Sequence, residues 1–404
     1  TADGWGDRAN ASIGIGEGDG LELLFRTPRL DLARIYRWST LLLGMKPNEH
    51  EYKVMGLAPY AKEYIKKEPY EVYKSTLRVD GLDFKYGVKP SDLFYWFKER
   101  FAGCRFDGIA GGLQQFSEEL MAEWIENCVA HYGISRIAIS GGLALNIKIN
   151  KRIAELDVVT EVLVPPGGGD TSIGVGAAYA YAAQNGATGI RGLDHAYLGP
   201  APTDEEITRA IGDAGIEGKY KVETGVDADT VAEHLAAGKV IARLCGAMEF
   251  GARALGNRSI LAHPGDFTVV QNINEKIKDR DFWMPFTPSI LEERGLDYLV
   301  NPKRLEAPYM TMAFESTPLA REHLVAAIHP YDKTVRPQIV TPATNAEYYR
   351  LIKAFEAKTG IGALLNTSFN LHGDPVVSSP VDALYTFENS GLDMLLMNDI
   401  LISK

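Results

Sequence analysis

The sequence is poor in the features that mark secreted and membrane-spanning proteins. Its 404 residues include three cysteines, Cys104, Cys128 and Cys245, which form no CxxC pair. An odd number of widely spaced cysteines favours free thiols in a reducing cytosol over a disulfide scaffold. The longer apolar runs, such as 173–183 and 361–365, fall short of the roughly 20 residues that cross a bilayer. We therefore expect a cytoplasmic protein with no membrane partner.

Positive charge is also scarce, with 42 Lys and Arg against 53 Asp and Glu and a net charge of −11. Surfaces that bind nucleic acid need excess positive charge to displace counterions. We therefore expect no nucleic-acid partner, and any anion site has to be local. The eight histidines show neither HxxxH nor HExxH spacing, so this sequence carries no strong histidine metal motif.

Alternating strand and helix patterns predict an α/β protein. Strand-like residues 134–140 and 158–164 each lead into a glycine-rich turn and then a helix, a pattern typical of folds that hold nucleotides at helix N-termini. The patterns also predict a hairpin at 12–25, helices at 30–43, 49–57, 111–132, 173–183 and 204–214, and strands at 70–88, 240–244, 309–314 and 362–365.

Composition shifts predict two domains. The first covers 1–185 and carries a cap-like insertion near 30–102. A region at 186–225, rich in Gly, Ala and Pro in its first part, is the expected linker. The second domain covers 226–404. The opening TADGWGDRAN has no Met and no leader pattern, so we expect the sequence to begin in mid-domain.

The densest chemical signal is a group of cations beside glycines, in EFGARALGNRS and KIKDR. It contains Arg253, Arg258, Lys278 and Arg280. Guanidinium forks and ammonium groups suit phosphate oxygens. The group therefore predicts a polyphosphate pocket, and a solvated basic face is the alternative.

Two later segments are candidates to complete such a pocket. Arg336 lies in TVRPQ, and Asn366, Ser368 and Asn370 alternate after an apolar strand. Alternate residues share one face of an extended segment. These side chains suit phosphate, adenine or a carbamoyl group, whereas a polar turn that closes the strand is the alternative.

Asp3 in DGWGD and Asp170 in GGGD are isolated carboxylates among glycines. Such loops hold a metal or let a ligand approach the backbone. A turn residue or a helix N-cap is the alternative interpretation for each.

Eight motifs occur in one order along almost the whole chain: DGWGD, HEYKVMGLAPYAK, SGGLALN, PPGGGDTSIGVGAAY, EFGARALGNRSIL, KIKDRDFWMPFTPS, TVRPQ and LLNTSFNLHGDPVV. In this order they resemble the NodU-type O-carbamoyltransferases. The resemblance implies an actin/hexokinase-like (ASKHA) domain, N-terminally incomplete in this sequence, followed by a YrdC-like α/β domain.

The resemblance also implies a two-step activity. The YrdC-like domain makes carbamoyl-adenylate from ATP, with Mg, and carbamoyl phosphate. The first domain then transfers the carbamoyl group to a hydroxyl of a small-molecule acceptor, a sugar or natural product, with help from a metal that is iron in relatives. AMP is the leaving group.

Site residues follow from the motifs of the family. The implied ligands of ATP and carbamoyl phosphate are Arg253, Arg258, Lys278, Arg280, Arg336, Asn366, Ser368 and Asn370. The implied ligands of carbamoyl-adenylate in the first domain are Gly141, Gly142, Asn146, Gly168 and Gly169. Asp3 and Asp170 are the implied metal ligands, and Arg253, Lys278 and Asp170 are the implied catalytic residues.

The sequence departs from the family pattern at two places. The family's HxxxH pair lies upstream of DGxG, and this sequence starts at that motif. Either it is a fragment, which we favour, or another chain completes the metal site, or transfer is lost. Met284 stands where relatives often have Arg, so one phosphate contact is absent or comes from Arg280. The sequence leaves open whether the protein forms a homodimer.

The acceptor pocket is expected in the first domain and its cap, where aromatic residues suit stacking on a sugar or aglycone. These are Tyr36, Trp38, Tyr60, Tyr95 and Trp96.

The alternatives to an O-carbamoyltransferase of this kind are a nucleotide-binding sensor, a half-enzyme that needs a partner, or a relative acting on tRNA or in hydrogenase maturation. The net charge of −11 and the absence of zinc-finger spacing disfavour the last two acceptors.

Overall fold

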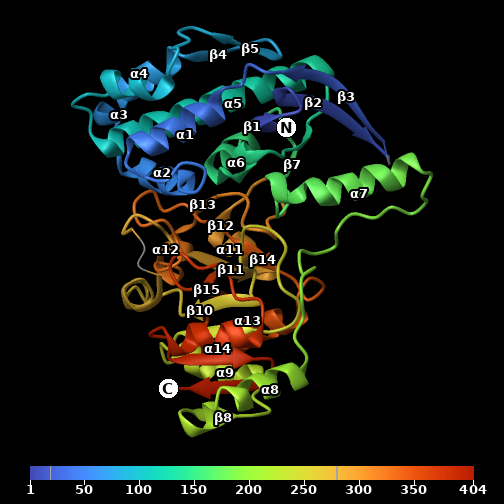
Figure 1. Ribbon diagram of the computed structural model, residues 1–404, viewed down its shortest axis with the longest axis vertical. Helices are drawn as coiled ribbons and strands as arrows, with labels where there is room; N and C mark the ends of the chain where they lie inside the picture. The colour runs from blue at the N-terminus through green and yellow to red at the C-terminus, as the bar shows by residue number, and fades with distance from the viewer. Residues whose placement is uncertain (19, 279–280) are drawn as a thin grey trace. The chain divides into compact units, whose positions relative to one another are not determined.

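The chain forms two compact units (Figure 1). The computed structural model describes residues 1–18, 20–278 and 281–404. Unit 1 comprises residues 1–192, 303–305 and 311–313, and unit 2 comprises residues 193–302, 306–310 and 314–404. Each unit contains both helices and strands, so the predicted α/β class is confirmed. The ASKHA and YrdC-like assignments stay predictions.

Unit 1 opens with a three-stranded antiparallel sheet in the order β1-β2-β3. Its strands are β1 (Ala2–Gly6), β2 (Ala9–Glu17) and β3 (Gly20–Thr27). The β2–β3 pair confirms the predicted hairpin. Two smaller sheets follow, an antiparallel pair of β4 (Leu77–Asp80) with β5 (Asp83–Tyr86) and a parallel pair of β6 (Arg136–Ala138) with β7 (Glu161–Leu163).

The helix α5 (Phe106–Tyr132) is the longest element of unit 1 and packs against three earlier helices. The helical segments of unit 1 are α1 (Leu32–Leu42), α2 (Glu51–Leu57), η1 (Ala58–Tyr60), α3 (Glu63–Lys74), α4 (Leu93–Arg100), α5, η2 (Gly142–Leu145), α6 (Ile147–Ala154), η3 (Asp170–Ser172) and α7 (Ile173–Gln184). Helices were predicted over 30–43, 49–57, 111–132 and 173–183, and those predictions are confirmed.

The expectation of strand from residue 70 is wrong for its first part, because residues 70–74 end helix α3 despite Pro69 inside it. Glycines of α5 let α3 approach closely. A Cβ on Gly112 would lie 2.6 Å from the backbone nitrogen of Tyr70, and one on Gly108 would lie 2.7 Å from Ile65. Close packing therefore stabilises a helix that local propensity disfavours.

Two short stretches from later in the chain complete unit 1. The ammonium of Lys303 donates hydrogen bonds to the carbonyl oxygens of Ala154, Leu156 and Val159 at 2.6–2.8 Å. It therefore caps the C-terminal end of α6, where carbonyls lack helical partners. The side chain of Asn150 bonds both Ala144 and Thr311 through their carbonyl oxygens at 2.7 Å.

Unit 2 is built on an eight-stranded mixed sheet in the order β14-β11-β15-β10-β9-β16-β17-β8. Its strands are β8 (Lys221–Glu223), β9 (Ile241–Leu244), β10 (Arg258–Ala262), β11 (Thr287–Leu291), β14 (Gln338–Val340), β15 (Ala363–Ser368), β16 (Met394–Met397) and β17 (Ile400–Ser403). The pairs β11–β14 and β9–β16 are parallel, and the others are antiparallel. The predicted strands at 240–244 and 362–365 are confirmed.

Helices and short elements surround this sheet along the chain. They are α8 (Asp204–Asp213), η4 (Ile216–Gly218), α9 (Ala228–Ala236), α10 (Thr268–Ile273), the π-helical turn η5 (Asn274–Lys278), η6 (Glu292–Arg294), α11 (Gly295–Tyr298), β12 (Leu299–Val300), β13 (Glu315–Ser316), α12 (Pro318–His323), α13 (Ala346–Thr359) and α14 (Pro380–Glu388).

The expected linker at 186–225 differs from the structure. Residues from 193 onward belong to unit 2, where α8 packs on α14 and β8 pairs with β17. Apolar residues of α8, such as Ile207 and Ile211, join the main core of unit 2, which a solvated linker would not do. The strand expected at 309–314 is also wrong, since only Phe314 makes an isolated bridge, with Val335.

The core of unit 2 lies between the sheet and its helices. It joins buried side chains of β9, β10, β15 and β16 with those of α8 and α14. Such a core holds in place the strands from which polar side chains project.

Among the helices that the structure describes, none combines the length and the hydrophobicity that a membrane-spanning segment needs.

Candidate functional site

A pocket of unit 2 lies at the C-terminal part of β15. Its lining brings together Arg253 from the loop before β10, Arg336 from the segment before β14, and Asn366 and Ser368 from β15. These residues are far apart in sequence, and the antiparallel pairing of β15 with β10 and β11 brings their segments together. The structure thus gathers four of the sequence-predicted residues in one site.

Lys278 lies beside this pocket at the end of the π-helical turn η5. Its side chain is almost entirely buried, and its ammonium donates to the hydroxyl of Ser368 at 3.2 Å and to the side-chain oxygen of Asn370 at 2.6 Å. A third bond, of 3.0 Å, goes to the carbonyl oxygen of Asn370. The predicted residues Lys278, Ser368 and Asn370 therefore form one cluster that places a buried cation next to the pocket.

A buried polar network holds Asn366. Its amide nitrogen donates to the hydroxyl of Ser289 at 2.9 Å and to the carbonyl of Ala254 at 3.2 Å, while Ser289 donates to the side-chain oxygen of Gln338 at 2.7 Å. The side-chain oxygen of Asn366 is buried and has no hydrogen-bond partner among the described residues. A buried acceptor without a partner is costly, and a ligand donor from the pocket would satisfy it.

Sequence reasoning missed Thr287 and Ser289 as parts of this site. Thr287 lines the pocket and donates to the carbonyl of Asn366 at 3.0 Å. Both residues lie on β11, where Thr287 is the register partner of Asn366. Their alternation in FTPS was the available signal, because residues two apart on a strand share a face.

Glu249 shapes the loop that carries Arg253. One of its carboxylate oxygens accepts from the backbone nitrogens of Leu255 and Asn257, each at 2.7 Å, and from that of Arg258 at 3.2 Å. Three donors converge on one buried carboxylate, which fixes the end of the loop. Sequence reasoning did not single out Glu249.

Arg258 is among the expected phosphate ligands, but its guanidinium is used inside the protein. It is fully buried and donates to the carbonyl oxygens of Cys245, Gly246 and Pro200 at 2.9–3.2 Å. Burial lowers the pKa of Arg258. In this structure Arg258 holds loops together and is not part of the pocket lining.

Arg280 lies outside the described residues.

In unit 1, three of the motifs meet through their backbones. Gly141 donates to the carbonyl of Gly168 at 2.6 Å, and Ala2 donates to that of Ser140 at 2.9 Å. Gly141 has φ +101°, and a Cβ there would lie 2.2 Å from the carbonyl oxygen of Ala2. Only glycine fits this close approach.

Asp3 and Asp170 have different surroundings. One carboxylate oxygen of Asp3 accepts from the backbone nitrogens of Gly4 at 2.6 Å and Gly142 at 3.2 Å. Asp170 is exposed at the start of η3, close in sequence to Gly168 and Gly169. Asp3 thus acts as a turn residue that binds backbone nitrogens, which was one of the two interpretations of the sequence. The side chain of Asp170 is exposed to solvent.

Asn146 has a structural role in unit 1. Its side-chain oxygen caps helix α6 by accepting from the backbone nitrogens of Lys148 and Ile149 at 3.1 Å. Its amide nitrogen donates to Gln114 of α5 at 3.0 Å. The side chain is therefore committed to capping and to α5, which differs from its expected role as a ligand of carbamoyl-adenylate.

Among the residues that the structure describes, no group of three or more His, Cys, Asp or Glu side chains is placed to hold a metal ion. Asp3 and Asp170 supply two carboxylates, and a transition-metal site takes more protein ligands than these. The described residues do not fit an iron centre by themselves.

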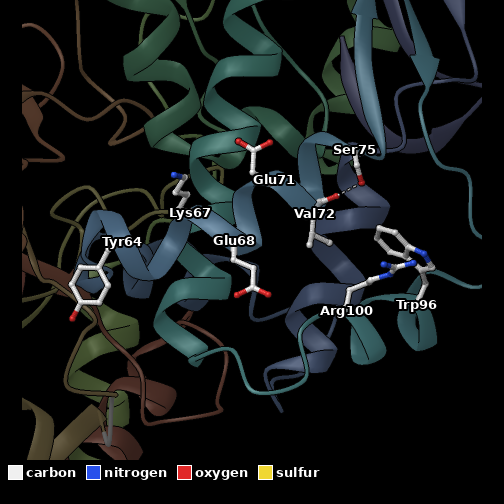
Figure 2. A pocket seen from close by; sticks show the side chains of 8 residues that line it. All are labelled: Tyr64, Lys67, Glu68, Glu71, Val72, Ser75, Trp96 and Arg100. Carbon is white, nitrogen blue, oxygen red and sulfur yellow. Dashed lines mark hydrogen bonds between the residues drawn. The ribbon is translucent and has the colours of Figure 1, made fainter.

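The cap of unit 1 contains a shallow groove between α3 and α4, with a volume of about 530 Å³ (Figure 2). Trp96 and Arg100 of α4 line it, and the guanidinium of Arg100 lies 5.5 Å from the Trp96 ring centroid. Tyr64 and Glu68 of α3 complete this polar and aromatic surface.

The other aromatics expected to contact an acceptor have varied environments. Tyr36 is buried and donates to Gln114 at 2.9 Å, so it belongs to the core. Tyr95 is 68% exposed. Trp38 lines a second cap pocket, formed by α1, the β4–β5 hairpin and the segment before α4.

The fold and the pocket define a two-unit α/β protein in which the buried ammonium of Lys278 and the side chains of Asn366 and Asn370 lie near the C-terminal end of β15. Family comparisons agree with this division. Residues 1–179 match the model described as "Carbamoyltransferase N-terminus", and residues 232–404 match the one described as "Carbamoyltransferase C-terminus".

Curated relatives extend the match over the chain. The chain is 33% identical to nodulation protein NolNO of Sinorhizobium fredii over its whole length, covering 60% of that protein. It is 30% identical to nodulation protein NolO of Bradyrhizobium diazoefficiens, again over its whole length, covering 74% of that protein. An uncharacterized protein of Methanocaldococcus jannaschii, MJ1058, is 32% identical over 92% of this chain and 62% of its own.

The chain belongs to the carbamoyltransferase family, a family of transferase enzymes. The predicted resemblance is thereby confirmed. The chain spans 62% and 60% of the length of two of these relatives.

Proposed function

We propose that this chain is the ATP-dependent part of an O-carbamoyltransferase. Unit 2 makes carbamoyl-adenylate from ATP and carbamoyl phosphate, and unit 1 passes the carbamoyl group to a hydroxyl of a sugar or natural product. The proposal rests on one observation above all. Arg253 and Arg336 line one pocket of unit 2 together with residues of β15, and the buried Lys278 bonds Ser368 and Asn370 beside it.

The residues of unit 2 suit the adenylation chemistry. Water cleaves carbamoyl phosphate to carbamate and phosphate, a carbamate oxygen attacks the α-phosphorus of ATP, and pyrophosphate leaves. Negative charge concentrates on the phosphate oxygens during both steps. Fixed cations stabilise that charge more strongly in a partly dehydrated pocket than in water.

The amide network supports recognition of the carbamoyl end. A carbamoyl group carries an NH₂ that donates hydrogen bonds, and the side-chain oxygen of Asn366 is a buried acceptor at the pocket to which no described residue donates. Such a match favours carbamoyl phosphate over acetyl phosphate, which lacks the donor.

In unit 1 the glycine-rich loops suit the second step. The backbones around Gly141 and Gly168 meet, and loops without side chains let a ligand's phosphate approach backbone nitrogens. The acceptor oxygen attacks the carbamoyl carbon, AMP leaves with the bonding electron pair, and the hydroxyl proton passes to solvent.

Replacing Arg253 by Ala tests the adenylation step. We expect carbamoyl-phosphate-dependent formation of carbamoyl-adenylate, followed with labelled ATP, to fall about a hundredfold or more, because one phosphate-binding cation is lost. Arg350→Ala is the matched control, since Arg350 is an exposed arginine of α13 that does not line the pocket. Native activity in Arg253→Ala would refute the assignment.

A nucleotide-binding sensor is the alternative from another class of function. ATP binding without turnover in the presence of carbamoyl phosphate would support it, and pyrophosphate release that depends on carbamoyl phosphate would exclude it.

A further inference from the structure

The second cap pocket of unit 1 has the charge of an anion site. It encloses about 440 Å³, which falls within the range of small-molecule pockets. Helix α1 contributes Arg34, Arg37 and Trp38, and the hairpin and following segment contribute Tyr86 and Lys89. Three cations therefore line one pocket of a chain whose net charge is −11.

The carboxylates of this pocket are already engaged. Asp31 accepts from the phenol of Tyr86 at 2.8 Å and lies 3.5 Å from the guanidinium of Arg34. Asp92 accepts from the backbone nitrogen of Tyr95 at 2.9 Å as the N-cap of α4. Neither carboxylate forms an ion pair with Arg37 or Lys89 in the described part of the chain.

Aromatic rings position the two remaining cations. The guanidinium of Arg37 lies 5.1 Å from the Trp38 ring centroid, and the ammonium of Lys89 lies 4.1 Å from that of Tyr86. Burial and the adjacent Asp31 raise the pKa of Tyr86, so the phenol stays neutral and does not offset Lys89. Two positive charges thus remain available to a ligand.

The wall that carries Lys89 is held in place. The backbone nitrogens of Gly87 and Val88 donate to the carbonyls of Thr76 and Ser75 at 3.0 and 2.8 Å. A Cβ on Gly87 would lie 2.3 Å from the carbonyl oxygen of Ser75. The loop therefore packs tightly on the hairpin, and a preformed pocket loses little entropy when it binds a ligand.

We propose that this cap pocket binds a sugar that carries a phosphate or carboxylate, with Arg37 and Lys89 as the residues that contact the anionic group. The pocket size suits one sugar ring, and the hydroxyl of Ser91 in its lining suits a sugar hydroxyl. The inference rests on the proposed function only in taking this sugar as the carbamoyl acceptor.

Calorimetric titration of the protein with glucose 1-phosphate, glucuronate and glucose tests the pocket. We expect an anionic sugar to bind at least about tenfold more tightly than glucose, and its affinity to fall as salt is added. The tighter of the two anionic probes identifies the group, phosphate or carboxylate. Failure of both to bind, or equal binding of glucose, would overturn the proposal.

The variant Arg37→Gln/Lys89→Gln should weaken binding of the anionic sugar about tenfold or more, because both charge-assisted bonds are lost. Arg100→Gln is the matched control, since Arg100 is also an exposed cap arginine stacked on a tryptophan but lies in the other groove (Figure 2). Unchanged affinity in the double variant, with a native circular dichroism spectrum, contradicts the proposal. If the double variant misfolds, Lys89→Gln alone decides the question in the same way.

Adenylate formation without any acceptor separates this proposal from the proposed function. Normal formation in Arg37→Gln/Lys89→Gln, together with lost sugar binding, supports the pocket as a separate site. Absence of adenylate formation in the native protein would contradict the proposed function, whereas the sugar-binding result would still apply to the cap pocket.

Discussion

At the scale of single residues, the site depends on positions where only one residue type fits. The alternation of Asn366, Ser368 and Asn370 was readable from the sequence, because alternate positions of a strand share a face. The capping role of Asn146 and the internal role of Arg258 were not readable. Both residue types also bind ligands, and only the fold shows which hydrogen bonds their side chains have already made.

Gly256 is the sharpest example of such a position. Its φ is +113°, and a Cβ would lie 2.4 Å from the Tyr348 ring. Arg243 donates to the carbonyl of Gly256 at 2.7 Å and lies over the same ring. The glycine thus lets a buried arginine and a tyrosine meet beneath the pocket loop.

Gly256→Ala should lower the free energy of unfolding by about 2–4 kcal/mol, because the new methyl group meets a buried ring in a left-handed backbone conformation. Gly212→Ala is the control, since Gly212 is exposed in α8 with open space around it. Urea denaturation should show the control unchanged or stabilised by up to about 1 kcal/mol. Equal stability of Gly256→Ala and the native protein would contradict the account of this loop.

At the scale of elements, strong periodicity predicted the long helix α5 and the β2–β3 hairpin. Helix α3 was missed because Pro69 and the aromatic residues near it suggest a strand. Its stability comes from contact with the glycines of α5, forty residues later in the chain. A local pattern cannot report a partner that distant in sequence.

Helix α8 shows that the region expected as a linker is a structured part of unit 2. Thr203 and Glu206 form a capping box at its start, with bonds of 3.2 and 2.8 Å. Thr203→Ala should cost about 1 kcal/mol of stability. Thr208→Ala is the control on the same helix, since its hydroxyl bonds only the carbonyl of Asp204. Chemical denaturation measures both, and a larger cost at Thr208 would argue against the cap.

At the scale of the whole molecule, the two units divide the proposed reaction. The proposed polyphosphate pocket is lined by residues of unit 2, whereas Asp3, Asp170 and the glycine-rich loops lie in unit 1. Composition shifts predicted two domains. The boundary was harder to predict, because small residues at 186–203 look alike whether they end one unit or begin the next.

In the proposed function Asp170 belongs to the transfer site of unit 1 and adenylation takes place in unit 2, so Asp170→Ala should leave carbamoyl-adenylate formation intact and block carbamoyl transfer. The two steps are measured separately, as pyrophosphate release and as carbamoylated acceptor, in a protein that performs both. Asp157→Ala, a change at another exposed aspartate of unit 1, is the control. Loss of both steps in Asp170→Ala would show that the two sites are not independent.

The place of β17 in the sheet also bears on how unit 2 is made. Strand β17 lies between β16 and β8, and Glu223 pairs with Leu401. During translation, β8 leaves the ribosome long before its partner exists, and its edge and the apolar face of α8 stay uncovered meanwhile. Sheets whose paired strands lie far apart in sequence fold slowly, and their folding intermediates are prone to aggregate. Production of this protein in a heterologous host should therefore benefit from chaperones and slow synthesis.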